Sequence, residues 1–556
     1  MKKITDIPEA PNPCLETSLS ECIGASLNYS QEDVMGSYLN PGTDLFRRAL
    51  NSEIYVDKTA MIAELNKAIN TERCCVCVSR PRRFGKSMAA NMIAAYYDHT
   101  SVDDDIFDKL SISKIPGGMK ERGRYDVIRI NMQEFLSNSH DVAGMVKLLE
   151  KAVLRDIQKA YPCVDYLMPD RLMFSLADVF SETGRSFVII IDEWDCIFRE
   201  FPHDEKAQRM YLDFLRDVLK DKPYVALAYM TGILPIKKYG THSALNMFTE
   251  FSMEHPDRMA PFVGFTEEET KSLCQHYGMD FAECRAWYDG YSFPGCPHVY
   301  CPKSVVDAML SHRFGSYWTR TETYEALQVY IDLNEDGLRD AIMKMMGGGR
   351  QKIDTGTFQN DMTTFHSADD VMTLLVHLGY LGYDSINEEV FIPNNEVMKE
   401  YVNATRQGGE WEIVSSAIRA SDTLLAAVFS GNEEKVASGV ESAHLETSHI
   451  QYNDENALSY TLSLAFYSAR RYYNIVREMS AGKGFADLAF LPRPRHMDKP
   501  AMVVELKWDK DAQTAISQIH DKQYGEALAP FAGRLILVGI SYDRKTRKHS
   551  CRIERV

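Results

Sequence analysis

The stretch CCVCVSRPRRFGKSMAANMIAAYY, residues 74–97, decides the fold class of this chain. Its first part, CCVCVS, is a short apolar run typical of a buried strand, and its last part, MAANMIAAYY, has the pattern of a helix. The loop between them, RPRRFGKS, ends in Gly-Lys-Ser. A strand, a loop and a helix in this order point backbone N–H groups at a phosphate, so the stretch predicts a nucleotide-binding loop.

Each position of this loop is assigned to the predicted ATP site. Lys86 is expected to reach the β- and γ-phosphates, and the hydroxyl of Ser87 is expected to ligate Mg²⁺. The usual pattern is G-x-x-x-x-G-K-[ST], but Arg80 stands at the first glycine position. Glycine is favoured there because it tolerates a positive φ, so Arg80 predicts a turn of different shape. The assigned residues are Arg80, Pro81, Arg82, Arg83, Phe84, Gly85, Lys86 and Ser87.

A second signal is FVIIIDE at 187–193, an apolar strand that ends in two carboxylates. Asp192 is predicted to help hold Mg²⁺, and Glu193 to polarise the attacking water. The alternative is a strand end with solvent-facing acids, which is common, but the nearby Gly-Lys-Ser favours ATP binding. A further strand, VALAYM, ends at Thr231, which is either a polar γ-phosphate sensor or simply the end of a strand.

The chain divides into four predicted parts. Residues 1–40, rich in Pro, Ser, Asn and Glu, are expected to form a flexible arm. Strands alternate with helical patterns in 41–260, which predicts an α/β domain with a parallel sheet of the P-loop NTPase type. Residues 261–445 are interpreted as a helical lid and connector. Residues 446–556 are interpreted as a smaller α/β domain.

The last part contains a candidate metal-dependent centre. Asp487 lies in the strand pattern GFADLAFL, and Glu505 and Lys507 lie in AMVVELKW. Glu505 and Lys507 are two positions apart in a strand, so their side chains project from the same face. Asp487 and Glu505 could hold Mg²⁺, and Lys507 could position or deprotonate a water. The alternative is a surface strand with alternating charges, but the apolar residues before Glu505 favour a catalytic centre.

Composition narrows the class of protein. The formal net charge of -17 argues against a surface coated with basic nucleic-acid contacts, but residues 482–556 hold 14 Lys and Arg against 9 Asp and Glu. No run of about 18 apolar residues could cross a membrane. The beginning of the chain lacks a secretory pattern, and the 12 Cys lack metal-like spacing. We therefore expect a cytoplasmic protein that makes no membrane contact.

Five motifs together resemble a known family, the bacterial and archaeal AAA-ATPase-like proteins with a C-terminal PD-(D/E)XK nuclease-like domain. The loop of this family commonly begins with Arg-Pro-Arg-Arg-Phe-Gly-Lys, so Arg80 is a feature of the family. The motif YVDKT is expected near the nucleotide site, although Asp57 could instead cap a helix. The motifs are YVDKT at 55–59, RPRRFGKS at 80–87, IDEWD at 191–195, TGI at 231–233 and WYDGY at 287–291.

The resemblance implies further residues and a function. Glu455 would supply another metal-site acid, and Gln518, Lys522 and Tyr524 would support the nuclease centre from one helix. Ala486 replaces the proline of the family name, which leaves the acid at 487 intact. The implied function is a nuclease regulated by ATP and dependent on Mg²⁺, with DNA as the expected substrate, although nothing in the sequence distinguishes DNA from RNA. A homo-oligomer in which a neighbour supplies an arginine is also expected. The alternative is a nucleotide-dependent switch whose nuclease-like domain binds nucleic acid or a partner without cleaving.

Overall fold

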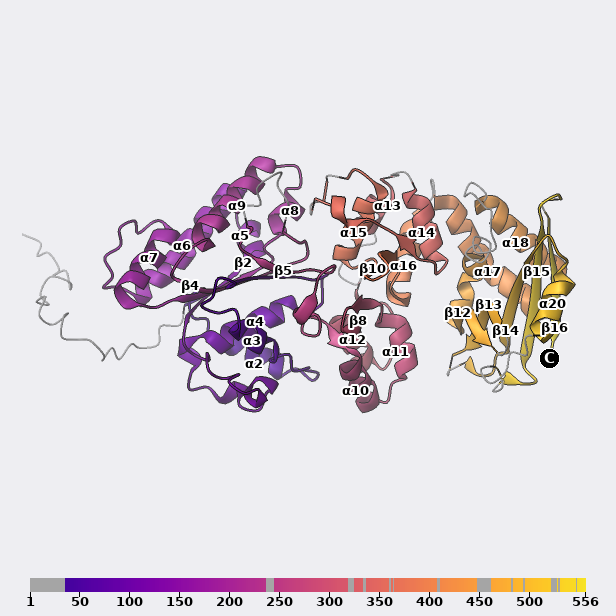
Figure 1. The fold of residues 1–556 in the computed structure, drawn as a ribbon, viewed down its shortest axis with the longest axis horizontal. Coiled ribbons are helices and arrows are strands. Elements are labelled where there is room, and N and C mark those ends of the chain that lie inside the picture. Colours follow the sequence, from indigo (N-terminus) through magenta and orange to yellow (C-terminus); the bar gives the residue numbers. More distant parts are fainter. Residues whose placement is uncertain are drawn as a thin grey trace, which may run out of the picture.

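The chain folds into three parts that follow one another along the longest axis of the molecule (Figure 1). The structure is a computed structural model, and the predicted arm lies outside its described residues up to position 35. Residues 36–40 pack on the first part, where Asn40 donates to Asp126 Oδ1 at 2.8 Å. The described ranges are 36–236, 245–318, 325–333, 337–359, 362–363, 365–407, 411–447, 462–481, 484–493, 496–521, 528, 531–546 and 548–556.

The first part is built on a parallel sheet in the order β2-β3-β4-β1-β5, which confirms the predicted α/β fold. Because both faces are covered, the strands consist almost entirely of buried residues, and Cys75 and Cys77 are part of this core. The strands are β1 (Cys75–Ser79), β2 (Asp126–Asn131), β3 (Phe187–Asp192), β4 (Val225–Gly232) and β5 (Thr249–Phe251).

Two groups of helices cover the two faces of this sheet (Figure 1). Helices α2 to α4 share one core cluster with alternate strand residues such as Val76 and Ile190. Helices α5 to α9 share the other, with Cys77 and Ile191. The bounds are α2 (Asp44–Leu50), α3 (Met61–Asn66), α4 (Lys86–Tyr97), α5 (Met132–Ser137), α6 (Val142–Ala160), α7 (Leu172–Thr183), α8 (Cys196–Glu200) and α9 (Glu205–Leu219).

The middle part is helical, as expected, but it also contains two small three-stranded sheets that the sequence did not reveal. They have the orders β6-β8-β7 and β10-β11-β9. The helices are α10 (Glu267–Tyr277), α11 (Phe281–Tyr288), α12 (Pro302–Ser311), α13 (Glu325–Ile331), α14 (Leu338–Met346), α15 (Ala368–Leu378) and α16 (Asn395–Ala404). The strands are β6 (Phe265–Thr266), β7 (Tyr291–Phe293), β8 (Cys296–Tyr300), β9 (Gln351–Lys352), β10 (Gly382–Asp384) and β11 (Glu389–Phe391).

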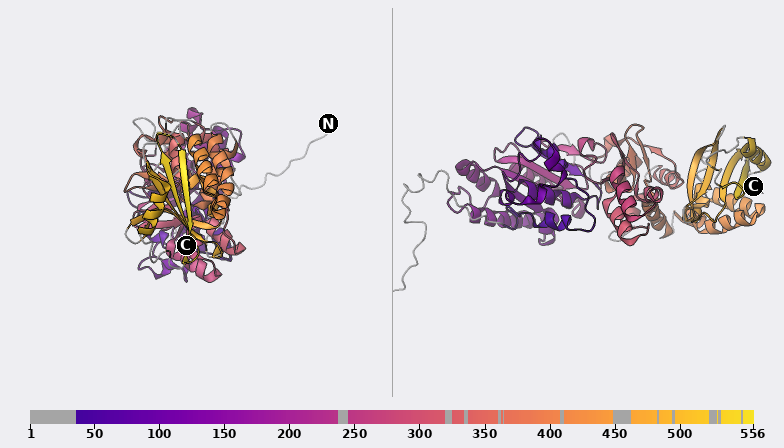
Figure 2. Two further views of the ribbon diagram at one scale, coloured as in Figure 1. Left: turned by 90° about the vertical axis from the view of Figure 1, so that its right-hand side faces the viewer. Right: turned by 90° about the horizontal axis from the view of Figure 1, so that it is seen from below.

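The C-terminal part is a mixed sheet in the order β12-β13-β14-β15-β16, in which only β14 and β15 run parallel among the described pairs. Helices α17 (Glu412–Ser430) and α18 (Glu433–Thr447) pack on one face, and α20 (Ala512–Asp521) packs on the other. This places two helices of the predicted connector with the C-terminal sheet (Figure 2). The strands are β12 (Tyr473–Ala481), β13 (Gly484–Pro492), β14 (Ala501–Trp508), β15 (Leu535–Asp543) and β16 (Lys548–Arg555).

No helix in the described ranges is long and apolar enough to span a membrane.

Candidate nucleotide site and candidate nuclease centre

The predicted loop joins β1 to α4, as the sequence indicated. Gly85 is the N-cap of α4 and has a φ of 93°, a left-handed conformation that glycine adopts without strain. Its place at the N-cap leaves the first turn of α4 without a capping side chain. The N–H groups of this turn therefore face an anion site that a phosphate would fill.

Arg80 has a different role from the one predicted for it. Its side chain is fully buried, and its Nη1 donates to the carbonyl oxygens of Phe251 and Ser252 at 3.2 and 3.0 Å. The guanidinium also lies 5.2 Å from the ring centre of Phe293, and burial lowers the pKa of Arg80 to about 10. The side chain of Arg80 thus ties the start of the loop to β5 and β7 and is not available to bind a phosphate.

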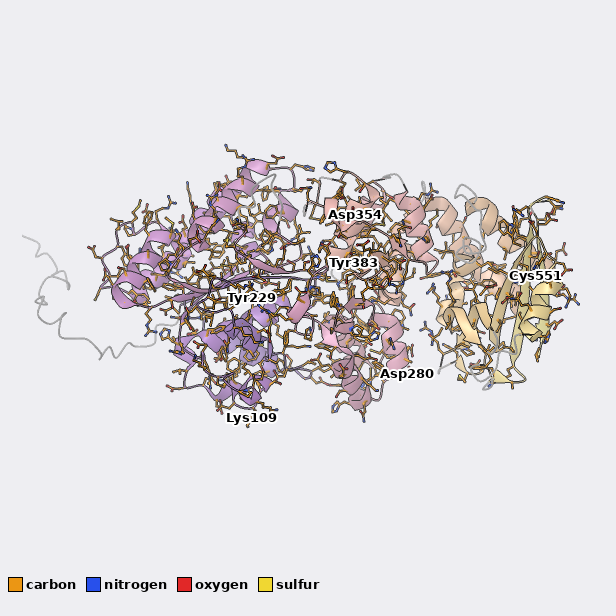
Figure 3. All side chains as sticks on the ribbon, in the orientation of Figure 1. Lys109, Tyr229, Asp280, Asp354, Tyr383 and Cys551 are labelled. Carbon is orange, nitrogen blue, oxygen red and sulfur yellow. The ribbon has the colours of Figure 1, made fainter. Side chains whose placement is uncertain are left out.

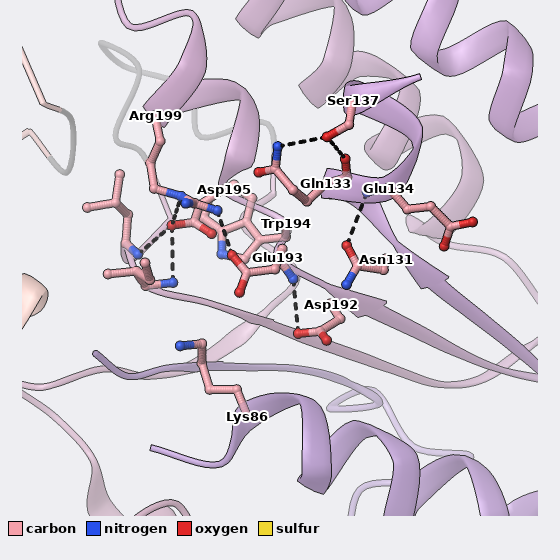
Figure 4. A network of polar contacts seen from close by, with 12 residues as sticks. Lys86, Asn131, Gln133, Glu134, Ser137, Asp192, Glu193, Trp194, Asp195 and Arg199 are labelled. Carbon is pink, nitrogen blue, oxygen red and sulfur yellow. Dashed lines mark hydrogen bonds and ion pairs between the residues drawn. The ribbon is translucent and has the colours of Figure 1, made fainter. Parts of the chain in front are cut away.

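Lys86 lies at the first position of α4, and its ammonium is held inside the loop. Its Nζ donates to the carbonyl oxygens of Arg80 and Pro81 at 3.0 and 2.9 Å. Burial lowers the pKa of Lys86, while the negative charges of Glu193 and Asp192 act in the opposite direction. Figure 4 shows Lys86 facing these acids from the other side of the sheet edge. A bound phosphate would replace the loop carbonyls as the partner of this ammonium.

The two predicted acids take different positions at the end of β3. Asp192 is fully buried, and its Oδ1 accepts from the N–H of Glu193 at 3.1 Å. Glu193 has a φ of 54°, an uncommon conformation for a residue with a side chain, which turns its carboxylate toward the loop. Arg199 of α8 donates to Glu193 Oε2 at 2.5 Å (Figure 4). Burial raises the pKa of Glu193, although Lys86 and Arg199 favour its charged form.

Thr231 lies where β4 ends, but its side chain belongs to the sheet. Its hydroxyl is fully buried and donates to the carbonyl oxygen of Val78 at 2.8 Å. Asp195 accepts from the N–H groups of Ile233 and Leu234 at 3.1 and 2.9 Å, which fixes the loop after β4. The expected role of Thr231 as a phosphate sensor is therefore not supported by its position.

A cavity of about 840 Å³ opens over the loop and the start of α4. Six of the eight predicted loop residues line it together with Glu193, whereas Arg80, Pro81, Asp192 and Thr231 do not. Tyr55 and Val56 of the YVDKT motif add an apolar wall, which suits a nucleotide base. The loop members of the lining are Arg82, Arg83, Phe84, Gly85, Lys86 and Ser87. The residues present therefore fit a nucleotide.

Several residues of the middle part contact the nucleotide loop. Trp318 Nε1 donates to the carbonyl oxygen of Arg82 at 3.2 Å, and the rings of Phe84 and Tyr291 meet edge to face with centres 5.1 Å apart. The Tyr291 hydroxyl donates to the carbonyl oxygen of Gly379 at 2.7 Å. Gly379 in turn lies so close to Pro81 that a Cβ there would stand 2.7 Å from Pro81 Cβ. The WYDGY motif thus fastens the middle part to the nucleotide loop.

The second centre lies on the face of the C-terminal sheet that α20 covers. Asp487 on β13 accepts from the N–H of Leu506 at 2.7 Å, which places it beside β14. Lys507 Nζ lies 3.5 Å from Glu505 Oε1, and Gln518 Nε2 of α20 donates to the same oxygen. Glu505 is 1% exposed, so its carboxylate is held in a nearly enclosed setting. The structure thereby brings together Asp487, Glu505, Lys507 and Gln518.

A close approach of α20 to β15 makes this arrangement possible. Gly539 is the neighbour of Glu505 on β15, and a Cβ on it would stand 2.4 Å from the carbonyl oxygen of Ala512. Only glycine leaves room for α20 at this distance, and α20 carries Gln518 to Glu505. Glu455, Lys522 and Tyr524 lie outside the described residues.

Asp487 and Glu505 offer only oxygen donors, which is the chemistry that Mg²⁺ prefers. Within the described ranges, no group of three or more His, Cys, Asp or Glu side chains is placed to hold a metal ion. Two carboxylates with several waters are nevertheless compatible with Mg²⁺, which usually keeps part of its water shell. The residues therefore fit this ion.

Two residues of the nucleotide site were missed by sequence reasoning. Arg199 lies six positions after Glu193 on a short helix, and its spacing from Glu193 in the sequence was the only signal. Trp318 is separated from Arg82 by 236 positions, so no local pattern connects them. Both depend on the tertiary structure.

In the first part, a Gly-Lys-Ser loop faces acids at the end of a strand, which is typical of P-loop ATPases. The C-terminal part has a mixed sheet with two acids and a lysine, which is typical of a nuclease-like domain. Together they define a P-loop ATPase-like protein with a nuclease-like domain. Residues 42–241 match the family model described as predicted AAA-ATPase, and residues 454–551 match that of the PD-(D/E)XK nuclease superfamily. The chain therefore joins an AAA-ATPase-like region to a PD-(D/E)XK nuclease-like region, which confirms the resemblance found in the sequence.

Individual relatives are distant. An uncharacterized protein in the vnfD 5′ region of Azotobacter chroococcum mcd 1 is 25% identical over 276 residues, which are 48% of this chain and 51% of that protein. The chain thus spans about half the length of this curated relative. A Walker-type ATPase of Pyrococcus abyssi is similar over 62% of this chain and 94% of its own, with 14% identity and a TM-score of 0.33. The ORC2 protein of Aeropyrum pernix is similar over 64% and 97%, with 10% identity and a TM-score of 0.28.

Proposed function

We propose that this protein is a nuclease that depends on a divalent metal ion and is regulated by ATP, with DNA as its substrate. The observation that carries the nuclease half is the convergence of Lys507 and Gln518 on the buried carboxylate of Glu505, one strand away from Asp487. The cavity over Lys86 and Ser87 supports the ATP half. The basic balance of the last 75 residues supports a phosphate-bearing substrate.

In the nuclease centre, each side chain has a distinct task in this proposal. Asp487 and Glu505 would hold Mg²⁺, which would supply Lewis-acid activation of a phosphodiester when bound. Lys507 would orient a water or stabilise the charge that develops on the phosphate. Gln518 would keep the Glu505 carboxylate in place through its hydrogen bond.

In the nucleotide site, Lys86 and the N–H groups at the start of α4 would bind the phosphates of ATP. Glu193 would orient the attacking water once Arg199 no longer engages its carboxylate. Ser87 would hold the Mg²⁺ that accompanies ATP, and Asp192, which is buried outside the cavity, would act on this ion through its water shell. Because the middle part contacts both the loop and, through α16 and α17, the C-terminal part, ATP binding could control cleavage.

The nuclease half is tested by incubating purified protein with labelled DNA and Mg²⁺ or Mn²⁺, beside Glu505→Gln and Lys507→Ala. The wild type is expected to cleave the DNA. The cleavage rate of each variant should be at least about 100-fold lower, since each substitution removes a group from the centre. If the wild type and both variants cleave no DNA or RNA under any condition, the nuclease proposal fails. The protein would then be a nucleotide-dependent switch whose C-terminal domain only binds.

The ATP half has its own test, because it can hold when the nuclease half fails. Lys86→Ala is expected to abolish ATP turnover, since the variant lacks the cation that faces the phosphates. Lys109→Ala is a matched control, because this exposed lysine of the same part (Figure 3) does not line the cavity. Turnover that survives unchanged in Lys86→Ala would show that the site lies elsewhere.

A further inference from the structure

A cleft of about 1150 Å³ lies between the middle part and the C-terminal part, away from both candidate sites. Helices α11 and α16 form one wall, and α17, the turn of 3-10 helix at Tyr467–Arg471 and the end of β13 form the other. Figure 3 places Asp280, the N-cap of α11, at the edge of the middle part that faces this boundary. A side pocket of about 370 Å³ continues the cleft past Arg470 and Arg493 toward Asn474.

Cations dominate the lining of this cleft, although the chain as a whole carries a formal charge of -17. Three carboxylates, Glu283, Glu400 and Asp422, stand against twice as many basic side chains. The basic residues come from both walls of the cleft. They are Lys399, Arg406, Arg419, Arg470, Arg471 and Arg493.

Arg470 and Arg493 lie side by side, and little negative charge balances them. Arg493 is 6% exposed, and its nearest carboxylate is Glu283 at 3.7 Å. In the part of the chain that the structure describes, Arg470 forms no ion pair with a carboxylate, and its Nε is buried without a hydrogen-bond partner. Burial lowers the pKa of Arg470, and the charge of Arg493 lowers it further. Arg470 is half-buried and has no carboxylate to balance its charge among the described residues, so this pair is suited to receive an anion.

Aromatic rings stand among these cations. Lys399 Nζ lies 4.7 Å from the ring centre of Trp287 on one wall, and the guanidinium of Arg470 lies 5.9 Å from that of Tyr467 on the other. Grooves that bind single-stranded nucleic acid combine basic side chains along the backbone with rings on which bases stack. Six basic side chains from both walls of the cleft suit the repeating phosphates of a strand better than the phosphate group of one free nucleotide. Bases can stack on such rings only where they are unpaired, which favours a single strand over a duplex.

We propose that this cleft binds a single strand of nucleic acid, with Arg470 and Arg493 holding one phosphate and Arg406 and Arg471 holding its neighbours. Its purpose rests on the proposed nuclease function, because the strand would be held at one end of β13 while Asp487 lies toward the other. Binding itself does not require cleavage. The two can therefore be tested separately.

The test is fluorescence anisotropy with a labelled single-stranded oligonucleotide, in EDTA and over a series of salt concentrations. The double variant Arg406→Gln, Arg471→Gln changes two exposed residues, so we expect the fold to stay intact. It is expected to bind about tenfold more weakly, and the slope of log Kd against log salt should fall by about 0.7 for each phosphate that is no longer neutralised. Arg470→Gln should also weaken binding, and Arg470→Lys should restore the salt slope because it keeps the charge.

Controls separate this proposal from the others. Lys120→Gln, whose side chain is 75% exposed in the ATPase-like part, should bind like the wild type. Because EDTA removes the metal ion that cleavage would need, the anisotropy measures binding whether or not the protein is a nuclease. Unchanged affinity in both the double variant and Arg470→Gln would overturn the proposal. Displacement of the strand by AMP or ATP at an equal phosphate concentration would also overturn it and assign the cleft to a small nucleotide.

Discussion

Trp318 Nε1 donates a hydrogen bond of 3.2 Å to the carbonyl oxygen of Arg82, so a residue of the middle part holds the backbone of the nucleotide loop. Trp318 is 4% exposed, and its own backbone N–H donates to Glu396 of α16 at 2.8 Å. A chain of hydrogen bonds therefore runs from the loop to α16, which lines the cleft beside the C-terminal part. This chain is the physical route by which the occupancy of the nucleotide site could reach the rest of the molecule.

Trp318→Phe removes the donor and keeps an aromatic ring. The carbonyl of Arg82 loses its partner, and the free energy of unfolding should fall by about 1 kcal/mol. ATP affinity should fall by about fivefold because the loop is held less firmly. Titration calorimetry measures this affinity. Trp411→Phe is the matched control, since its indole donates to Asp332 at 2.9 Å and not to the loop. An equal loss of ATP affinity in both variants would contradict the role of Trp318.

Arg199→Gln should shift the pH dependence of ATP turnover. Burial raises the pKa of Glu193, and the positive charge of Arg199 partly offsets this effect. Without Arg199 the pKa of Glu193 rises further, so the carboxylate is protonated at a higher pH. The acidic limb of the kcat/KM profile, which reports the free enzyme in which Arg199 pairs with Glu193, should therefore move to higher pH. Arg216→Gln, on the surface of α9, should leave the limb in place; a limb that does not move in Arg199→Gln would contradict this assignment.

Gly539→Ala should displace α20 from the sheet and so destabilise the C-terminal part. Its Cβ would stand 2.4 Å from the carbonyl oxygen of Ala512, and that backbone atom can move only if α20 moves. We expect a loss of about 1–3 kcal/mol in the free energy of unfolding, as for other overpacked sites. Chemical denaturation measures it. At Gly315 the nearest atom to an added Cβ is 3.9 Å away, so Gly315→Ala should be nearly neutral, and equal stability of both variants would show that α20 is not tightly packed.

Glu396 gives a prediction about stability and pH. Burial raises its pKa to about 7, although the N–H groups of Tyr317 and Trp318 favour the charged form. The folded protein then holds a proton that the unfolded chain releases near pH 4.5, so stability should fall as the pH rises from about 4.5 to 7. The loss is at most about 3 kcal/mol, since one pKa unit corresponds to about 1.4 kcal/mol.

Glu396→Gln cannot ionise and should lack this part of the pH dependence. Melting curves between pH 5 and 8 compare it with the wild type and with Glu434→Gln, an exposed control on α18. The wild type and Glu434→Gln should lose stability in parallel, while Glu396→Gln loses less. Parallel curves for all three proteins would contradict the buried, proton-binding state of Glu396.

The sequence predicted the elements whose signals are local. The parallel sheet could be predicted because its strands are buried on both faces and therefore read as unbroken apolar runs, such as FVIII at 187–191. Glu505 and Lys507 could be placed on one face because they are two positions apart in a strand. The small sheets of the middle part escaped prediction because their strands, such as β6 (Phe265–Thr266), are too short to show a period.

Contacts between distant segments could not be predicted in the same way. Arg80 was assigned to the nucleotide because it stands in the loop, but the carbonyls of β5 that receive its guanidinium lie about 170 positions away, as the bond to Phe251 spans 171. The sequence could not decide whether Thr231 is a phosphate sensor or simply the end of a strand, because the acceptor of its hydroxyl, the carbonyl oxygen of Val78, lies on a neighbouring strand. The interdomain cleft depends on how α16, α17 and the end of β13 meet, which no single stretch of sequence encodes.

The most direct measurement is the rate of DNA cleavage by the purified protein in Mg²⁺, with and without ATP, beside Glu505→Gln and Lys86→Ala. The proposed function predicts a wild-type cleavage rate that changes with ATP, no cleavage by Glu505→Gln, and no response to ATP in Lys86→Ala. A wild type that cleaves nothing in either condition, or a response to ATP that persists in Lys86→Ala, would contradict it.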